Sequence, residues 1–322
     1  MKITVLGGGA WGTALACVAV DCGHDVVVWA RNAAIAASIN HTHRNEAHLP
    51  DVVLPEALKA TTNLVLALAG SHIVLAVTPA QTTRAVLAAT KPSLPKEATL
   101  VLCAKGIEAE TGLFLTDIAK AVLPDQQLAV LSGPGFAGEI ARGLPSAVTL
   151  ASSQIDDALA LAETLSSLRF RIYASDDMRG VEAGGALKNI IAIAAGAVQG
   201  AGLGASASAA MVTRGFAELK RIGEAFGGRA ETLNGLSGLG DLILTCNSTQ
   251  SRNFQFGRDL ALGQASKALA EGTATAHIAA DLAIKQHIDA PIITAISALI
   301  KGQTTINDAV AALMARPLRE EN

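Results

Sequence analysis

The first twelve residues, Met1-Lys-Ile-Thr-Val-Leu-Gly7-Gly-Gly9-Ala10-Trp-Gly12, decide the fold of this 322-residue chain. An apolar, β-branched run stops at a Gly-x-Gly-x-x-Gly motif, and a helical pattern follows. In this context the first glycine permits a tight turn, the second lets a pyrophosphate approach the backbone, and the third lets the helix pack on the sheet. Amides at the helix start then face the phosphates. The segment predicts a dinucleotide site that includes Gly7, Gly9, Ala10 and Gly12, and its context disfavours a glycine-rich turn without a ligand.

Composition and charge exclude several classes of partner. Half of the residues are hydrophobic but only 3% are aromatic, and the formal net charge is -3. Stacking platforms for bases are therefore not expected, and no long run of lysine or arginine could neutralise a nucleic acid or an anionic membrane. The charge-free stretch 189–213 is interrupted by glycine and serine, which indicates a buried helix and a loop rather than a membrane span.

Cysteine usage and the N-terminal segment predict a cytoplasmic protein. The four cysteines show no Cys-x-x-Cys spacing, as is typical of a reducing compartment. Glycines interrupt the N-terminal apolar run and no small-residue cleavage site follows it, so we expect no signal peptide.

The pattern along the chain predicts an α/β fold: an N-terminal Rossmann-type domain, residues 1–176, with a mostly parallel sheet, and an all-α domain, residues 177–322. Continuous apolar runs separated by helical segments indicate a sheet covered on both faces. The expected strands are 2–6, 25–30, 72–77, 99–104, 128–132, 145–151 and 170–173. The expected helices of the second domain are 181–198, 206–226, 259–262, 275–287, 292–301 and 306–315. Asp176 or Asp177 is a candidate cap for the first of them.

Arg31 follows the second strand, 19 residues beyond Gly12. NAD-specific sites usually place an acidic residue there to bind ribose hydroxyls, whereas arginine suits a 2′-phosphate. The sequence therefore favours NADP, alongside NAD, as the cofactor. The alternative is that Arg31 is a solvated surface arginine.

Lys188 lies beside an apolar helical stripe that includes Leu187, Ile190 and Ile191. Burial would lower the pKa of its ammonium toward neutrality, and a carboxylate such as Asp241 would oppose that shift. The balance suits a general acid or base. A surface lysine whose stem covers apolar side chains remains an equal alternative.

A second polar cluster spans residues 236–242 and 247–253. Its glycines expose backbone amides, and Ser251, Arg252 and Asn253 add donors, which is what a small phosphate monoester requires. A polar loop between helices is the competing interpretation. The spacing of His41, His43 and His48 matches no standard ligand set, and no metal site is expected.

Together these pieces resemble bacterial-type NAD(P)-dependent glycerol-3-phosphate dehydrogenases along nearly the whole chain. The segments that carry the resemblance are Gly7-Gly-Gly-Ala-Trp-Gly12, Val77-Thr-Pro79, Ala104-Lys-Gly-Ile-Glu108, Leu131-Ser-Gly-Pro-Gly-Phe-Ala137, Gly185-Ala-Leu-Lys-Asn189, Gly238-Leu-Gly-Asp-Leu242 and Ser251-Arg-Asn253. The resemblance implies reversible reduction of dihydroxyacetone phosphate to sn-glycerol 3-phosphate for glycerophospholipid synthesis. It also implies a helical domain like the C-terminal domain of 6-phosphogluconate dehydrogenase.

The resemblance assigns roles to individual positions. Lys188 would exchange the proton at the substrate oxygen. The implied substrate contacts are Lys105, Gly133, Gly135, Lys188, Asp241, Ser251, Arg252 and Asn253. The implied cofactor contacts, beyond the glycine turn, are Trp11, Arg31, Lys105, Ala137, Arg252, Leu269 and Glu271.

The sequence departs from the family at three places. Gly135 replaces a hydroxyl residue, so only backbone contact with substrate is expected there. His48 stands where tyrosine is common, and Leu269 replaces a valine-like residue.

Two other functions stay open from the residues. One is a β-hydroxyacid dehydrogenase of the 6-phosphogluconate dehydrogenase type, against which the Gly-Leu-Gly-Asp and Ser-Arg-Asn segments argue. The other is a non-catalytic NADPH-binding redox sensor, which would have no use for Lys188. Apolar, alanine-rich helices make a homodimer the expected assembly.

Overall fold

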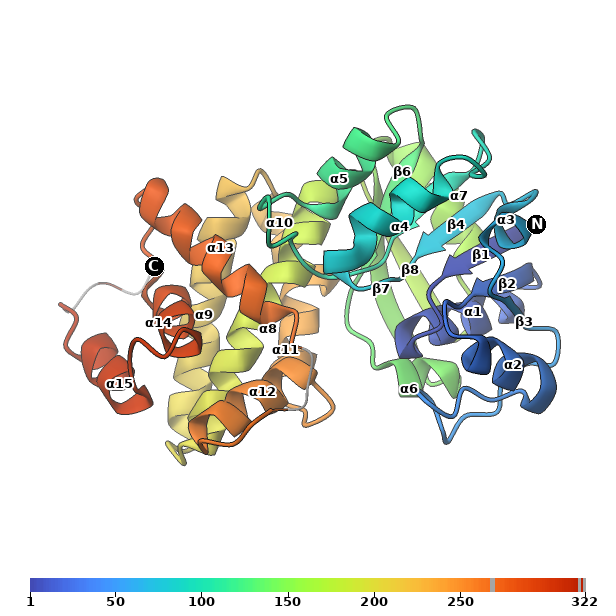
Figure 1. The fold of residues 1–322 in the computed structure, drawn as a ribbon. Coiled ribbons are helices and arrows are strands. Elements are labelled where there is room, and N and C mark those ends of the chain that lie inside the picture. The colour runs from blue at the N-terminus through green and yellow to red at the C-terminus, as the bar shows by residue number, and fades with distance from the viewer. Residues whose placement is uncertain (267–269, 318–319, 321–322) are drawn as a thin grey trace.

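The computed structural model describes residues 1–266, 270–317 and 320. A twisted sheet flanked by helices forms one half of the molecule, and helices packed around α8 (Met178–Gly200) form the other (Figure 1). Leu269, one of the expected cofactor contacts, lies outside the described residues.

The sheet has the strand order β3-β2-β1-β4-β5-β6-β7-β8. Neighbouring strands pair in parallel except β6 and β7, which pair antiparallel. The strands are β1 (Lys2–Leu6), β2 (Asp25–Trp29), β3 (Lys59–Thr61), β4 (Ile73–Ala76), β5 (Thr99–Leu102), β6 (Leu128–Ser132), β7 (Ser146–Ser152) and β8 (Phe170–Ser175). The mostly parallel sheet expected from the sequence is confirmed. β3 was not predicted, because its three residues, Lys-Ala-Thr, carry no apolar run.

Helices that cover the sheet alternate with its strands. They are α1 (Ala10–Asp21), α2 (Ala33–Thr42), α3 (Leu64–Leu68), the short 3-10 helix η1 (Ala80–Thr82), α4 (Thr83–Thr90), α5 (Leu115–Val122), α6 (Ala137–Ala141) and α7 (Ile155–Leu165). Two apolar cores result, one on each face of the sheet: Val5 and Val28 belong to one, and Leu6 and Val74 to the other. Such double coverage explains why the buried strands read as continuous apolar runs.

From Asp177 onward the described elements are helical. They are α8, α9 (Ala205–Ala225), α10 (Ala230–Leu233), the π-helical turn η2 (Leu236–Gly240), α11 (Asp241–Cys246), α12 (Arg252–Ala261), α13 (Gly272–Lys285), α14 (Pro291–Ile300) and α15 (Ile306–Met314). The Asp177 carboxylate accepts from Gly180 N at 2.8 Å and caps α8. Among the described helices, α8 alone is long and apolar enough to cross a membrane, and 94% of that window is buried in this fold.

The predicted helix 259–262 was wrong in its extent. Ser251 caps a longer helix, α12, by accepting a hydrogen bond from Phe254 N at 3.2 Å. The start of this helix was not predicted because its polar residues are of the types that occur both at helix N-termini and in loops.

A loop from the sheet half anchors the helical half. Ile107 and Phe114, which flank the turn after β5, are buried in the core formed by α8 and its neighbours. The ring of Phe114 packs edge-on against Phe226, with the centroids 4.8 Å apart. Glu182 on α8 accepts from Thr116 N at 2.9 Å, at the start of α5. Apolar and polar contacts therefore hold the two halves together beside the carboxyl ends of the strands.

Candidate active site

Lys188 lies on α8 and is buried, with 6% of its surface exposed. Its Nζ donates to Asp241 Oδ1 at 2.9 Å and to Thr245 Oγ1 at 2.6 Å. The surface alternative for this lysine is wrong, because its side chain is buried and its ammonium group is paired inside the protein.

Asp241 joins Lys188 to Lys105. The first lysine binds one carboxylate oxygen, and Lys105 Nζ donates to the other, Oδ2, at 2.7 Å. Lys105 follows β5, so this ion pair connects the carboxyl edge of the sheet to the helical half of the molecule. Its Nζ also donates to Gly133 O at 2.7 Å. Two ammonium groups and one carboxylate give the cluster a net positive charge when all three are ionised, which suits an anionic substrate.

Opposing effects set the protonation of this cluster. Burial is the largest influence on Lys188 and lowers the pKa of its ammonium; Asp241 opposes the shift, and the charge of Lys105 adds to it. For Asp241, burial alone would raise the pKa, but the two lysines outweigh it and the net pKa is lowered. The carboxylate therefore stays ionised while Lys188 is brought toward a pKa at which it can exchange a proton.

Glycines let α8 approach its neighbours closely enough to form the cluster. A Cβ at Gly184 would lie 2.9 Å from Ser237 O in η2, and one at Gly185 would lie 2.5 Å from Ser132 Oγ at the end of β6. Lys188 is one turn further along the same helix. The turn η2 leads directly into Asp241, and π-helical turns often occur at functional sites.

The Ser251-Arg252-Asn253 segment starts α12. Asn253 Nδ2 donates to Asn189 Oδ1 at 3.0 Å, and its Oδ1 accepts from Gly272 N at 3.0 Å. Arg252, the first residue of the helix, is exposed. Residues 247–251 form a polar loop between α11 and α12, as the competing interpretation expected, whereas Arg252 and Asn253 belong to the helix. The positive end of that helix dipole adds to the donors of these residues.

The glycine turn has the shape that a dinucleotide requires. Gly7 has φ +129, and a Cβ there would lie 2.9 Å from Val77 O. A Cβ at Gly12 would lie 2.0 Å from Gly7 O. Both glycines are therefore required by packing, whereas a Cβ at Gly9, the residue before Ala10, would have no heavy atom within 4 Å.

Trp11 belongs to this turn and lies beside the lysine cluster. Lys105 Nζ stands 5.6 Å from the centre of its ring, and its indole Nε1 is buried without a hydrogen-bond partner among the described residues. The open face at Gly9 and the unused indole donor fit a dinucleotide laid along the turn toward Lys105.

The other expected cofactor contacts lie around the same edge. Arg31 is exposed just beyond β2, and Ala137 is the first residue of α6. Glu271 Oε1 accepts from Ala80 N at 3.4 Å, so it connects the start of α13 to the turn after β4. Burial raises the pKa of Glu271, and the nearby charge of Arg252 opposes that shift.

Gly133 and Gly135 flank Pro134 after β6. Gly133 has φ +153, and a Cβ there would lie 2.8 Å from Val148 Cα, so glycine is required by the backbone. A Cβ at Gly135 would lie 2.6 Å from Ile140 Cδ1. The flexible end of Ile140 is all that opposes a side chain at this position.

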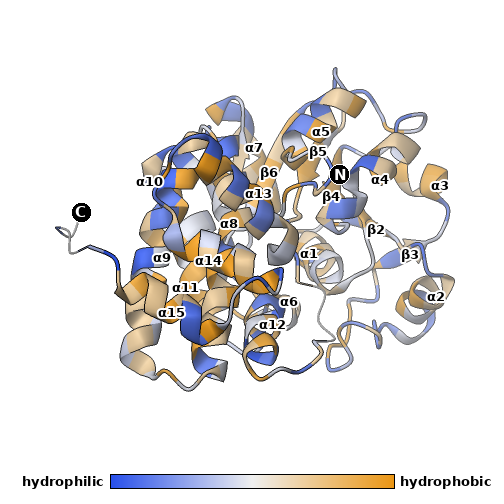
Figure 2. Cartoon of the chain, turned by 60° about the vertical axis from the view of Figure 1, so that its left-hand side comes forward, coloured by the Kyte–Doolittle hydropathy of each residue, from blue (hydrophilic) through white to orange (hydrophobic). Residues whose placement is uncertain are grey.

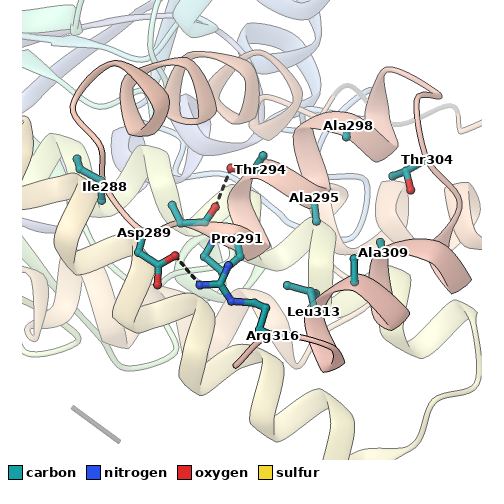
Figure 3. Close-up of a pocket in the computed structure, with 12 residues that line it drawn as sticks. Ile288, Asp289, Pro291, Thr294, Ala295, Ala298, Thr304, Ala309, Leu313 and Arg316 are labelled. Atoms are coloured by element: carbon teal, nitrogen blue, oxygen red, sulfur yellow. Dashed lines mark hydrogen bonds and ion pairs between the residues drawn. The ribbon is translucent and has the colours of Figure 1, made fainter. Parts of the chain in front are cut away.

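A surface cavity of about 450 Å³ lies elsewhere, between α14 and α15 (Figure 3). Arg316 pairs with Asp289 across it at 2.6 Å. None of its lining residues belongs to the lysine cluster or the glycine turn. Within the described part of the chain, no group of three histidine, cysteine or acidic side chains is arranged to hold a metal ion.

Sequence reasoning missed two residues that contact the cluster. Thr245 Oγ1 accepts from Lys188, and Asn189 Nδ2 donates to Lys105 O at 3.4 Å. If a helix had been predicted over 241–246, Thr245 would have been placed on the same face as Asp241, because residues four apart share a helix face.

Two family models match the chain. The model of the NAD-dependent glycerol-3-phosphate dehydrogenase N-terminus matches residues 2–158, and that of its C-terminus matches residues 177–311.

Relatives of known name agree with the family models. A glycerol-3-phosphate dehydrogenase [NAD(P)+] from Mesorhizobium japonicum is 55% identical over 99% of this chain and 94% of its own. One from Brucella ovis is 52% identical over 100% of this chain and 99% of its own. The crystal structure of glycerol-3-phosphate dehydrogenase from Coxiella burnetii superposes with a TM-score of 0.92 at 37% identity, covering 98% of this chain and 99% of that one. These similarities support the glycerol-3-phosphate dehydrogenase hypothesis over the two alternatives, a β-hydroxyacid dehydrogenase and a redox sensor.

Proposed function

Because the chain belongs to the NAD-dependent glycerol-3-phosphate dehydrogenase family, we propose that Lys188 performs proton transfer in the interconversion of dihydroxyacetone phosphate and sn-glycerol 3-phosphate. The protein is an oxidoreductase that uses NAD or NADP. The observation that carries the proposal is a buried lysine whose ammonium group is held by Asp241 and Thr245 beside the strand ends.

During reduction, Lys188 gives a proton from Nζ to the C2 oxygen of the ketone, and it recovers that proton from solvent after the alcohol leaves. The nicotinamide ring supplies a hydride at C2 when bound. Lys105 orients the substrate while Asp241 keeps both ammonium groups in place. Since the proton moves from a group fixed by two hydrogen bonds, its geometry is set before the substrate binds.

The phosphate of the substrate is assigned to the start of α12. Ser251, Arg252 and Asn253 lie there, and the helix dipole favours an anion. Lys105, Gly133 and Gly135 lie at the facing sheet edge, and Asp241, at the start of α11, binds Lys105 from the helical half. These four residues complete the substrate site that we propose. Arg252 then reaches substrate and cofactor together.

We assign the cofactor to the turn 7–12, with Arg31 on a 2′-phosphate and Ala137, Glu271 and Leu269 as further contacts. An arginine at the end of β2 supports NADP, alongside NAD. The division into a cofactor domain, residues 1–176, and a substrate domain, residues 177–322, follows the change from strands to helices near Asp177.

We further propose that the protein is a cytoplasmic homodimer that supplies glycerophospholipid synthesis. The dimer proposal is supported by α14 and α15, which are mostly hydrophobic (Figure 2) and enclose a groove lined in part by Ala295, Ala298 and Leu313. Light scattering coupled to gel filtration measures the assembly, and a monomer at micromolar concentration would contradict it.

The first experiment compares wild type with Lys188→Ala and Lys188→Arg. Loss of NADPH absorbance after addition of dihydroxyacetone phosphate reports turnover. We expect both variants to lose at least about a thousandfold in kcat, because proton transfer by a positioned group contributes up to about 10⁴-fold. NADPH still binds to both.

The arginine variant is the matched control. It keeps a positive charge beside Asp241 but does not release a proton at working pH. Turnover near the wild-type level in either variant would remove Lys188 from the mechanism, and no turnover by wild type with either cofactor would contradict the proposed reaction.

A further inference from the structure

Asn45, in the loop after α2, is tied to the glycine turn. It is almost fully buried, with 1% exposed. Its Nδ2 donates to Gly8 O at 2.9 Å and to Thr13 Oγ1 at 2.8 Å. One side chain thus connects a separate loop to both the turn and the first helix.

The chemistry of the contact fixes the orientation of the Asn45 amide. Nδ2 has two hydrogens, and both are used. A flipped amide would place Oδ1 against the carbonyl of Gly8, where two acceptors would repel each other. Asn45 therefore holds the Gly8 carbonyl from one side.

The loop that carries Asn45 is itself anchored. Asn45 O accepts from His48 N at 3.1 Å and from Leu49 N at 2.7 Å. Leu49 is buried in the core that contains β1, β2 and α1. Asn45 is therefore a fixed support and not a side chain that follows the turn.

Holding the Gly8 carbonyl also fixes the next amide. In a planar trans peptide, the C=O of Gly8 and the N–H of Gly9 point in opposite directions. A hydrogen bond from Asn45 to that oxygen directs the Gly9 N–H away from Asn45. Gly9 is the N-cap of α1, and the position of its missing side chain faces no protein atom.

We infer that Asn45 is a positioning residue for the cofactor: it holds the Gly8–Gly9 peptide plane so that the Gly9 N–H faces the pyrophosphate. This inference rests on the proposed cofactor site at residues 7–12. Asn45 does not touch the reacting atoms. It acts by keeping a donor oriented before the cofactor arrives, which reduces the cost of binding.

The test measures NADPH affinity by nicotinamide fluorescence in wild type, Asn45→Ala and Asn40→Ala. Asn40 is the matched control, because its amide makes two 2.8 Å hydrogen bonds to Ala60 and none to the turn. We expect Asn45→Ala to raise the Kd of NADPH by about tenfold, the equivalent of one hydrogen bond to backbone. Its kcat at saturating NADPH stays within about twofold of wild type.

Both variants lose hydrogen bonds between elements, so the Tm of each should fall while the NADPH affinity of Asn40→Ala stays at the wild-type value. A Kd for Asn45→Ala within about twofold of wild type, with a lowered Tm, would show that Asn45 has a structural role alone. Asn45→Ser, which is too short to reach both partners, replaces Asn45→Ala if that variant does not fold.

A further variant separates this inference from the site on which it rests. Gly9→Val adds a side chain where no protein atom stands. If Gly9→Val leaves NADPH binding unchanged, the cofactor site itself is wrong. If Gly9→Val weakens binding and Asn45→Ala does not, only the role of Asn45 is overturned.

Discussion

The glycine turn and the lysine cluster are built in opposite ways. The turn is a contiguous segment, residues 7–12, in which Gly9 leaves the backbone open because no protein atom lies near the position of its missing side chain. The cluster brings together three charged side chains from separate elements: Lys105 after β5, Lys188 on α8 and Asp241 on α11. The first depends on local conformation and close packing, and the second on the placement of one half of the molecule against the other.

The two regions also differ in what a substitution would disturb. At the turn, packing requires Gly7 and Gly12, while Gly9 is left to the ligand. In the cluster, no member is independent, because Asp241 holds both lysines and each lysine stabilises its charge. Mutations can therefore separate folding from binding at the turn, whereas in the cluster they should change several properties together.

Of the substitutions that test this comparison between the turn and the cluster, Asp241→Asn should have the largest effect on activity. Removal of the carboxylate leaves Lys188 buried without its counter-charge, so its pKa falls further. Reduction needs the protonated lysine and is lost as pH rises through that pKa, so the loss moves to lower pH. We expect kcat near neutral pH to fall by about a hundredfold or more.

A pH series of kcat for wild type and Asp241→Asn measures this shift. Asp176→Asn is the control, since Asp176 pairs with Arg229 at the surface, before the start of α8. A pH profile of Asp241→Asn that coincides with the wild-type profile would show that Lys188 does not depend on Asp241.

Gly9→Val and Gly12→Val separate ligand from fold within the turn. Gly9 has φ -76 and ψ 178, which valine adopts without strain, and its side chain would enter the space assigned to the pyrophosphate. We expect the KM for NADPH to rise by about tenfold to a hundredfold with Tm unchanged. Gly12→Val should lower Tm sharply, because its Cβ overlaps Gly7 O. An equal loss of Tm in both variants would show that packing requires Gly9 as much as Gly12.

Arg31→Asp has the smallest expected effect. Arg31 is exposed, so stability should not change. A carboxylate repels a 2′-phosphate and accepts from ribose hydroxyls, and the ratio of kcat/KM for NADPH over NADH should fall by about tenfold. Steady-state kinetics with both cofactors decides this, and an unchanged ratio would show that Arg31 does not contact the 2′-phosphate.

Expectations from the sequence succeeded where the signal is local. The apolar runs predicted every strand but β3, whose three residues have no pattern. The burial of Lys188 was an open choice, because a lysine beside an apolar stripe either covers it or lies inside it. The start of α12 at Ser251 was hidden for a similar reason, as capping residues also compose loops.

Contacts that join distant parts of the chain could not be predicted from local sequence patterns. Lys105 and Asp241 are 136 residues apart. Ile107 and Phe114 come from the sheet half of the chain, yet they lie in the core of the helical half. Asn45 shows no motif that would link it to Gly8, 37 residues earlier.

The sequence by itself determined the parallel sheet, the glycine turn at its first strand and, through its motifs, the family of the protein. These features follow from residue types at fixed short spacings, which act on backbone conformation directly. The tertiary structure alone decided that Asp241 binds two lysines, that Asn45 supports the glycine turn, and which glycines packing requires. Those outcomes depend on distances between segments far apart in the chain, which only the packing of the whole fold sets.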